Sequence, residues 1–195
     1  MERQANIKRV TRETKINLKL NLDTNKESII DTGIGFFDHM LNNFAKHSFT
    51  HMELAVIGDL EVDTHHTIED TGIVFGQGIK EAVGDKKGIR RYGTAILPMD
   101  EALILCSLDL SGRPYLVFDV PLTATKVGDL DTEMVKEFFY AISYSAGMNL
   151  HIKLIHGSNN HHIIEGVFKA FAKALDQAIS YDERIIDVLS TKGTI

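Results

Sequence analysis

The amphipathic pattern of the chain starts at residues 16–22, where every second residue is hydrophobic. Successive side chains of a strand point to opposite faces, so this alternation predicts a strand with one buried face. Further apolar segments predict strands at Met52–Ile57, Arg91–Leu97, Ala102–Leu110, Tyr115–Val120 and His151–His156. Ser111–Pro114 has the composition of a turn, and the strands on either side of it are expected to form a hairpin.

Helices are predicted where apolar residues recur three or four positions apart. The expected helices are Phe36–Lys46, Thr64–Val83, Glu133–Ser145, and a last helix that runs from the capping residues Ser158–Asn160 to about Tyr181. The polar C-terminal residues, which end in Ser190-Thr191-Lys192-Gly193, are expected to form a loop or tail.

Two of these helices carry the same phrase, His-His-x-x-Glu, at His65–Glu69 and, 96 residues later, at His161–Glu165. Residues four apart share one face of a helix, so the first His and the Glu of each copy can bind one ion. The adjacent histidines, His66 and His162, point about 100° away around the helix and are expected to face a second ion. The doubled phrase therefore predicts a two-metal site, which is typical of an enzyme.

The apolar residues behind each copy also repeat. Counted from the first His, they recur at positions +3, +10 and +14: Ile68, Phe75 and Ile79 in the first half, and Ile164, Phe171 and Leu175 in the second. These positions form one stripe of a helix, the side that is expected to pack against a sheet. Agreement in register as well as in motif indicates an internal duplication.

Each half thus contains strands, a shorter helix, a strand and a long helix. This order predicts an α+β fold of two pseudo-symmetric halves, each a small β-sheet covered on one face by helices. No Pro- or Ser-rich linker separates the halves. We therefore expect residues 1–195 to form a single domain made of two pseudo-repeats, about 1–90 and 91–195.

Composition narrows the classes of function. Hydrophobic residues make up 44% and charged residues 25%, as in ordinary globular proteins. A net charge of −6 without a cluster of Lys and Arg argues against nucleic acid as a partner. The chain lacks a secretory signal pattern and an apolar segment of membrane-spanning length, and the lone Cys106 is expected to be a packed strand residue. A cytoplasmic location is expected.

The duplication predicts one further ligand on each shorter helix. His39 precedes His65 by 26 residues, and Glu137 precedes His161 by 24. If the halves superpose, His39 and Glu137 occupy matching places, and each completes one metal site. A mixed set of imidazole and carboxylate ligands without thiolate favours manganese or iron over structural zinc. In the His-His-x-x-Glu phrase the carboxylate follows both histidines, unlike in the His-Glu-x-x-His phrase of zinc proteases. The Glu of each phrase is therefore expected to be a metal ligand.

Five segments carry a wider pattern, in the order Gly33–Leu41, Asp63–Asp70, Pro98–Ala102, Asp109–Pro114 and His161–Ala170. Together they resemble the imidazoleglycerol-phosphate dehydratase family, over nearly the whole chain. The resemblance implies a ribosomal protein S5 domain 2-like fold and a hydro-lyase of histidine biosynthesis, which dehydrates D-erythro-imidazole glycerol phosphate to imidazole acetol phosphate. It also implies two Mn²⁺ ions per active site and a homo-oligomer of 24 subunits with sites shared between subunits. Many members have His where this chain has Glu137.

The resemblance further implies roles for single residues. Proton transfer would fall to Glu13, Asp100 and Glu165, the last of which would also bind metal. The substrate would be bound by Glu13, His47, Arg91, Arg113, Lys169, Ser190, Thr191 and Lys192. Arginine suits phosphate because its planar group donates several hydrogen bonds, while lysine supplies a point charge. A role for residues 190–192 implies that the tail folds over the substrate or over a neighbouring subunit.

The implied substrate explains the need for two metals. The proton that leaves is on a carbon without a neighbouring carbonyl, so a simple general base would face a high barrier. If both ring nitrogens bind metal ions, the ring is held as imidazolate and can push electrons toward the adjacent carbon to expel its hydroxyl group. The acid and the base must then flank the two reacting carbons.

Two other classes of function fit part of the pattern. A two-metal phosphate-ester hydrolase would also cluster His and carboxylate ligands, but such sites usually contain more bridging Asp residues. A non-catalytic metal-storage protein would keep the doubled phrase but would have no use for Arg91, Arg113 and Lys192.

Overall fold

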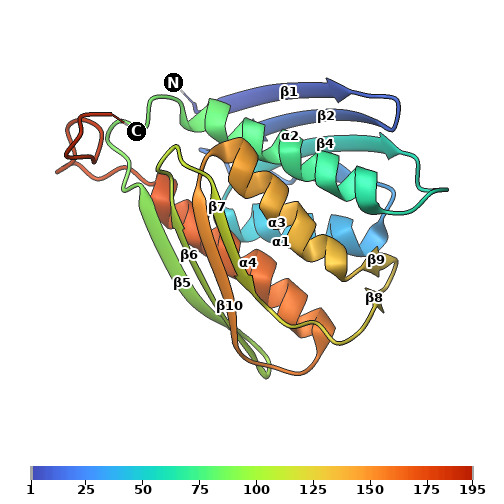
Figure 1. Ribbon diagram of the computed structural model, residues 1–195. Helices are drawn as coiled ribbons and strands as arrows, with labels where there is room; N and C mark the ends of the chain where they lie inside the picture. The colour runs from blue at the N-terminus through green and yellow to red at the C-terminus, as the bar shows by residue number, and fades with distance from the viewer. Residues whose placement is uncertain (1, 195) are drawn as a thin grey trace.

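Within residues 2–194, the part of the chain that the computed structural model describes, four helices lie between two four-stranded sheets (Figure 1). The first half contains β1 (Gln4–Val10), β2 (Thr14–Asn21), β3 (Ile29–Asp31), α1 (Gly35–Ser48), β4 (His51–Gly58) and α2 (His65–Val83). The second half contains β5 (Tyr92–Met99), β6 (Ala102–Asp109), β7 (Tyr115–Asp119), α3 (Glu133–Ala146), β10 (Asn149–His156) and α4 (Asn160–Ile179). A small hairpin, β8 (Lys126–Val127) and β9 (Leu130–Asp131), precedes α3.

The two halves have the same topology. The strand order is β1-β2-β4-β3 in one sheet and β5-β6-β10-β7 in the other. In each sheet three strands are antiparallel, and the short edge strand runs parallel to its neighbour. The predicted α+β fold of two similar halves, each with a sheet covered on one face by helices, is confirmed.

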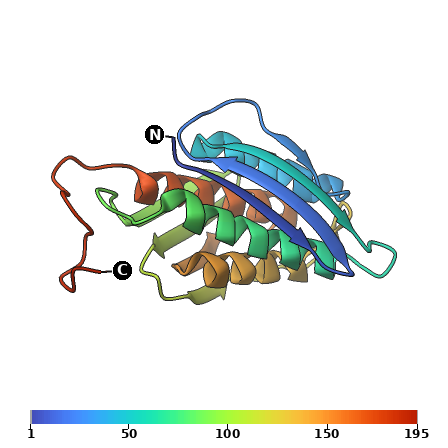
Figure 2. The ribbon, with the colours of Figure 1, turned by 90° about the horizontal axis from the view of Figure 1, so that it is seen from above.

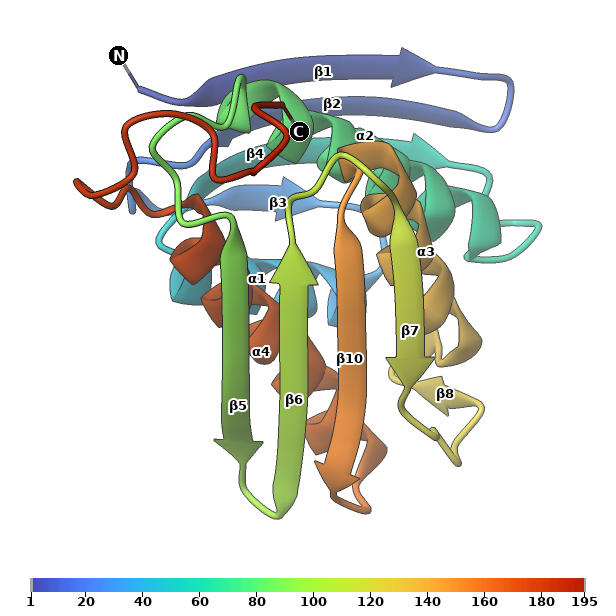
Figure 3. The same cartoon turned by 60° about the vertical axis from the view of Figure 1, so that its left-hand side comes forward.

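The helices form two inner layers. Helix α2 packs against β1 and β2, and α4 packs against β5 and β6, while α2 contacts α3 and α1 contacts α4 (Figure 3). Seen from above, the first sheet runs across the helices, and the C-terminal segment extends beyond one end of the molecule (Figure 2). None of the helices in the described part of the chain has the length and apolar character needed to cross a membrane.

The predicted stripes are buried. Their six apolar side chains, Ile68, Phe75, Ile79, Ile164, Phe171 and Leu175, are at most 2% exposed. At Phe75 and Phe171, however, the stripe meets other helices and not only a sheet, because the ring of Phe44 from α1 lies 5.0 and 5.4 Å from their centroids. The core therefore joins the two halves through aromatic contacts.

The predicted helices and strands are present with ends shifted by a few residues, but one pairing was wrong. The expected hairpin between β6 and β7 does not form, because β10 lies between them and β7 pairs with β10 in parallel. Both edges of β6 are already occupied by β5 and β10. The Ser111–Pro114 turn therefore crosses the start of β10, where the Arg113 carbonyl accepts a hydrogen bond from the Asn149 side chain at 2.6 Å.

Cys106 lies on β6 and is fully buried, as expected for a packed strand residue. Burial raises the pKa of its thiol far above the ordinary value, so the thiol is neutral in the folded protein. The loops after α4 contact the loop that leads into β5 through isolated bridges, Lys87 with Val188 and Ile89 with Tyr181. These bridges hold the C-terminal segment beside the second sheet.

Candidate metal centre and substrate site

Three predicted ligands come together between α1 and α4. The ligand atoms of His39, His161 and Glu165 all lie within 4.8 Å of one another. One carboxylate oxygen of Glu165, Oε2, lies 3.3 Å from Nε2 of His161 and 3.7 Å from Nε2 of His39. Two imidazoles and a carboxylate without thiolate suit a divalent transition metal such as manganese. The residues present thus fit an ion at this place.

Local structure fixes the two helices that carry the triad. The side chain of Asn159 accepts a hydrogen bond from the backbone N–H of His161 at 2.9 Å and caps α4, as the sequence predicted. At the start of α1, the carboxylate of Asp129 accepts the backbone N–H groups of Gly35 and Phe36 at 2.7 and 3.0 Å. The ring of Phe36 then meets the His161 ring edge-on, with centroids 5.0 Å apart.

Glu165 is buried, and a second contact fixes its carboxylate. The ammonium group of Lys169 donates a hydrogen bond to Oε1 at 2.5 Å, which leaves Oε2 facing the two histidines. Burial pushes the pKa of Glu165 upward, but the hydrogen bond and charge of Lys169, together with His39, outweigh burial and hold the pKa below its ordinary value. Glu165 is therefore ionised, as a metal ligand must be.

The first copy of the phrase is more open. Nε2 of His65 lies 3.7 Å from Oε2 of Glu69, and both side chains are nearly half exposed. Glu137 is the fifth residue of α3, as His39 is the fifth of α1, and α3 packs against α2 as α1 packs against α4. Glu137 thus belongs to the helix that faces His65 and Glu69. Its role as a ligand stays a prediction.

The triad joins residues from both halves of the chain, a pairing that the sequence spacing did not indicate. His39 comes from the first half, whereas His161 and Glu165 come from the second. The reason is the packing of α1 against α4, which places each shorter helix against the long helix of the other half. By the same packing, α3, which carries Glu137, lies against α2, which carries the first-half phrase.

The second histidines of the two phrases turn away from the first, as the helical geometry predicted. The rings of His65 and His66 lie 6.3 Å apart at 70°, and those of His161 and His162 lie 6.0 Å apart at 79°. Each turned ring meets acidic groups. Nδ1 of His66 lies 3.0 Å from Asp59, and Nδ1 of His162 lies 2.6 Å from Glu101.

These carboxylates shift the titration of both rings. The hydrogen bond to Asp59 raises the pKa of His66 above its ordinary value, and the hydrogen bond to Glu101 does the same for His162. In return, the contact with His162, helped by the backbone N–H of Asn159, lowers the pKa of Glu101 to about 2. The pair of Glu101 and His162 therefore favours a charged carboxylate beside the histidine.

Two of the predicted acid–base residues lie at the other nitrogen of these rings. A carboxylate oxygen of Glu13 lies 3.8 Å from Nε2 of His66, and one of Asp100 lies 3.6 Å from Nε2 of His162. Both carboxylates are more than half exposed. The sequence reasoning found these two residues but missed Asp59 and Glu101. Glu101 could have been found from the duplication, because Glu13 immediately precedes β2 just as Glu101 immediately precedes β6.

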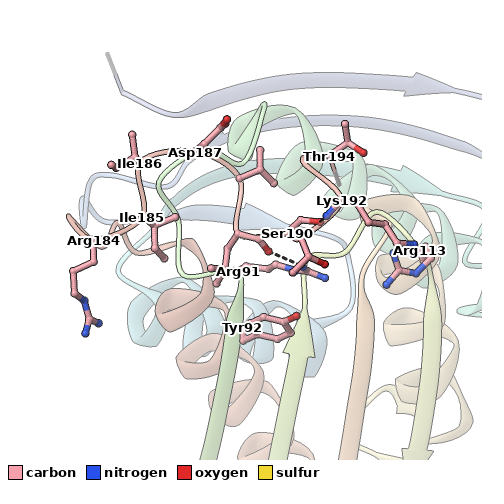
Figure 4. Close-up of a pocket in the computed structure, with 13 residues that line it drawn as sticks. Arg91, Tyr92, Arg113, Arg184, Ile185, Ile186, Asp187, Ser190, Lys192 and Thr194 are labelled. Carbon is pink, nitrogen blue, oxygen red and sulfur yellow. Dashed lines mark hydrogen bonds between the residues drawn. The ribbon is translucent and has the colours of Figure 1, made fainter.

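Most of the predicted phosphate-binding residues surround one cavity of about 650 Å³ beside the C-terminal segment (Figure 4). The five predicted residues that line it are Arg91, Arg113, Ser190, Thr191 and Lys192. Figure 4 shows Ser190 and Lys192 from the tail close to Arg91, with Arg113 beside Lys192. The tail thus folds back beside the second sheet, and its part in a site stays a prediction.

Arg91 has structural partners within this cavity. Its guanidinium donates to both oxygens of Asp109, at 2.6 and 3.0 Å, and to the carbonyl of Leu189 at 2.6 Å. These bonds tie the tail to the start of β5 just before Ser190. Arg91 therefore positions the tail, whatever it contributes to a ligand.

His47 and Lys169 lie outside the residues that line the cavity and belong to the neighbourhood of the triad. Burial, followed by the charges of Lys169 and Lys173, lowers the pKa of His47 below its ordinary value. His47 is accordingly a neutral imidazole near a cluster of ammonium groups. Within one chain, the predicted substrate residues thus fall into three separate places, since Glu13 lies beside His66.

The comparison with known sequences decides the family. A sequence model of the imidazoleglycerol-phosphate dehydratase family matches residues 32–175, well over half of the chain. This chain belongs to the imidazoleglycerol-phosphate dehydratase family. The imidazoleglycerol-phosphate dehydratases of Lachnoclostridium phytofermentans and Acetivibrio thermocellus are 64% and 56% identical to it over 195 residues, which cover the whole of both chains in each comparison.

Crystal structures of imidazoleglycerol-phosphate dehydratases share the fold. The Staphylococcus aureus enzyme is 43% identical with a TM-score of 0.84, and the match covers 92% of this chain and 99% of that one. The Pyrococcus furiosus enzyme, solved in complex with (S)-C348, is 35% identical with a TM-score of 0.84, and covers 97% of this chain and 100% of its own. The family resemblance read from the five sequence segments is confirmed.

Proposed function

We propose that this chain catalyses the dehydration of D-erythro-imidazole glycerol phosphate to imidazole acetol phosphate, a hydro-lyase step of histidine biosynthesis. The observation that carries this proposal is the full-length identity of 64% to an imidazoleglycerol-phosphate dehydratase. The triad of His39, His161 and Glu165 adds support, because the reaction needs metal ions at the imidazole ring. A phosphate-ester hydrolase is not favoured, since the relatives in the comparison carry the dehydratase name.

Two Mn²⁺ ions per active site are part of the proposal. The triad would hold one ion, and His65, His66, Glu69, His162 and Glu137 are the ligands proposed for the remaining positions. When bound, the cations would supply positive charge that favours the anionic form of the substrate ring, and an anionic ring would ease the loss of the adjacent hydroxyl group as water. The ionised state of Glu165, fixed by Lys169, supports its part in this ligand set.

The proton transfers fall to carboxylates of the chain itself. Glu13 and Asp100 lie near Nε2 of His66 and His162 and are exposed, so that a substrate can reach them. One of these two carboxylates is proposed to take the proton from the carbon next to the ring-bearing carbon. The other is proposed to give a proton to the departing hydroxyl group. Glu165 is the third candidate for proton transfer. Its contacts with two histidines and Lys169 favour the role of ligand.

The phosphate group is proposed to bind in the cavity beside the tail. Arg113 and Lys192 would supply positive charge, and Ser190 and Thr191 would supply hydroxyl donors. The contact of Arg91 with Leu189 would hold these tail residues in place. His47 and Lys169 would contact the substrate from the triad side. A phosphate held at one end and a ring held at the other fix the carbons between them.

A homo-oligomer of 24 subunits with shared active sites is also proposed. The pair His65 and Glu69 is open to solvent, so further ligands can approach it from a neighbouring subunit. Large apolar side chains are exposed on the outer faces of both sheets, for example Ile57 at 71%, Ile96 at 59% and Tyr115 at 60%. Such side chains favour burial against other subunits.

The decisive experiment is turnover by protein stripped of metal with a chelator and then supplied with Mn²⁺. Ketone formation from imidazole glycerol phosphate, with the phosphate group retained, is expected only after Mn²⁺ is restored. Release of inorganic phosphate would instead identify a hydrolase. If Mn²⁺ binds but neither product forms, the chain binds metal without catalysing this reaction, and the proposal fails.

A further inference from the structure

His66 and His162, the second histidines of the two phrases, are both anchored by a carboxylate at the same ring atom. Nδ1 of His66 lies 3.0 and 3.2 Å from the two oxygens of Asp59. Nδ1 of His162 lies 2.6 Å from Oε2 of Glu101. In each half, therefore, an acidic side chain accepts at Nδ1 and leaves Nε2 facing outward toward the exposed acidic groups.

The two anchors are not related by the duplication. Asp59 follows β4, whereas Glu101 precedes β6. The first-half counterpart of Glu101 is Glu13, which lies near Nε2 of His66 and not near Nδ1. The same contact at Nδ1 is thus made by carboxylates from different places in the two halves. Because unrelated residues make the same contact in the two halves, both histidines are inferred to need a carboxylate at Nδ1.

Glu101 is itself held in a fixed orientation. Its other oxygen, Oε1, accepts the backbone N–H groups of Asn159 at 2.8 Å and Ser158 at 3.3 Å. These residues lead into α4, the helix that carries His162. Oε1 is committed to the backbone, so Oε2 is directed at the imidazole.

We propose that Asp59 and Glu101 are positioning residues that keep the ring proton of His66 and His162 on Nδ1. A carboxylate at Nδ1 stabilises the tautomer with the proton on that atom, so the lone pair of Nε2 is left free to bind a metal ion. The inference rests on the proposed metal-dependent function. It adds two carboxylates, one per half, that select the ligand atom without touching the ion.

Glu101→Gln is a sharp test because the backbone fixes how the new amide must lie. The amide oxygen is required by the N–H groups of Ser158 and Asn159, so the NH₂ group must face Nδ1 of His162. A donor at that place forces Nδ1 to accept, and the proton moves to Nε2. The size of the side chain and its backbone contacts stay the same, so the fold is expected to be retained.

The tautomer is measured on the metal-free protein by ¹⁵N NMR of labelled histidines, at a pH where the rings are neutral. The wild type is expected to carry the proton of His162 on Nδ1, and Glu101→Gln to carry it on Nε2. Mn²⁺ titration of the same samples is expected to show a loss of affinity of about 10–100-fold at one class of site. Asp59→Ala, which removes the acceptor at His66, is expected to weaken binding by a similar factor.

Glu61→Gln is the matched control, since Glu61 is exposed in the loop that also contains Asp59 and the change removes one negative charge. Its Mn²⁺ affinity is expected to stay within about twofold of the wild type. The inference is overturned if Glu101→Gln leaves the proton on Nδ1, or if Asp59→Ala and Glu101→Gln bind Mn²⁺ as tightly as Glu61→Gln. Failure of the proposed function looks different: the tautomer and affinity change as expected, but wild type loaded with Mn²⁺ forms no ketone.

Discussion

Nε2 of His39 and Oε2 of Glu165 lie 3.7 Å apart although the two residues are separated by more than half of the chain. An ion held between them would connect α1 of the first half to α4 of the second. Metal binding should therefore stabilise the association of the halves as well as serve the reaction.

His39→Ala is predicted to lose much of the stabilisation that Mn²⁺ gives. A ligand at 100 times its Kd stabilises a folded protein by about 2.7 kcal/mol. The thermal midpoint with and without Mn²⁺ measures this gain, which should shrink in the variant. His156→Ala, at an exposed histidine near the end of β10, is the control and should keep the full gain. Equal Mn²⁺-dependent shifts in both variants would contradict a site at His39.

Arg113→Ala is predicted to raise KM for imidazole glycerol phosphate by roughly tenfold or more, with a smaller effect on kcat. The reason is the loss of a charged donor for phosphate, and hydrogen bonds to charged groups contribute about 1.5–3 kcal/mol. Steady-state kinetics measure the change. Lys46→Ala, which removes an exposed cation from α1, should leave KM unaltered. An unchanged KM in Arg113→Ala would exclude this residue from the phosphate site.

Asp129→Ala is predicted to lower the free energy of unfolding by about 0.5–2 kcal/mol, because the N–H groups of Gly35 and Phe36 lose their acceptor. Urea denaturation measures the loss. Asp129→Asn keeps an acceptor and should lose less. The Mn²⁺ affinity should fall along with stability in Asp129→Ala, since α1 carries His39. Equal stability of the two variants would argue against a capping role.

Gly76→Ala is predicted to destabilise the protein by about 1–3 kcal/mol. A Cβ at this position would lie 2.7 Å from the carbonyl oxygen of Ile142 and from the side chain of Ser145, so α2 and α3 would have to separate. Gln77→Ala changes the neighbouring exposed position of the same helix and should be nearly neutral. Chemical denaturation of both variants measures the difference, and a stabilised Gly76→Ala would show that the helices move apart readily.

Acid should remove the contribution of the ion pair between Glu101 and His162. The folded-state pKa of Glu101 is lowered to about 2, so its contribution is complete above the ordinary value of 4.5 and is lost as the pH falls from there toward 2. The pKa of His162 is raised, so the part due to the charged ring is present below 6.5 and is lost as the pH rises through the folded value.

The difference in unfolding free energy between wild type and Glu101→Gln should therefore be greatest between about pH 4.5 and 6.5 and should narrow on either side. Denaturation curves across this range measure it. A difference that grows steadily down to pH 2 would mean that Glu101 stabilises the fold mainly in its protonated form.

The sequence predicted much of the fold because the apolar pattern is strong where elements are buried on one face. The alternation at Ile16–Leu22 and the two stripes led directly to β2, α2 and α4. Strand β1 was missed because Gln4–Val10 contains few large apolar residues, and most of its side chains lie partly or fully open to solvent. The local apolar pattern also could not predict that β7 pairs with β10 and not with β6. The competition of β10 for the edge of β6 is a long-range effect.

Candidate site residues could be named from the sequence one by one, but the grouping of His39 with His161 and Glu165 could not be predicted. Spacing identified His39 and His161 as candidate ligands, yet it could not show that α1 packs against α4 and so joins them. Spacing also gave no reason to select Asp59, which lies just beyond the predicted strand Met52–Ile57. The contact of Asp59 with the His66 ring depends on how the loop after β4 lies against α2, and only the folded structure shows this.

The division of the triad between the halves bears on how such a protein could have arisen. A half-length ancestor folded in the same way would have kept its shorter helix out of reach of its own His-His-x-x-Glu phrase. Two copies would have had to meet face to face before either could capture an ion with three side chains. Association of two copies would then have preceded metal binding and catalysis. Gene fusion would have made permanent an association that separate copies had to form by diffusion.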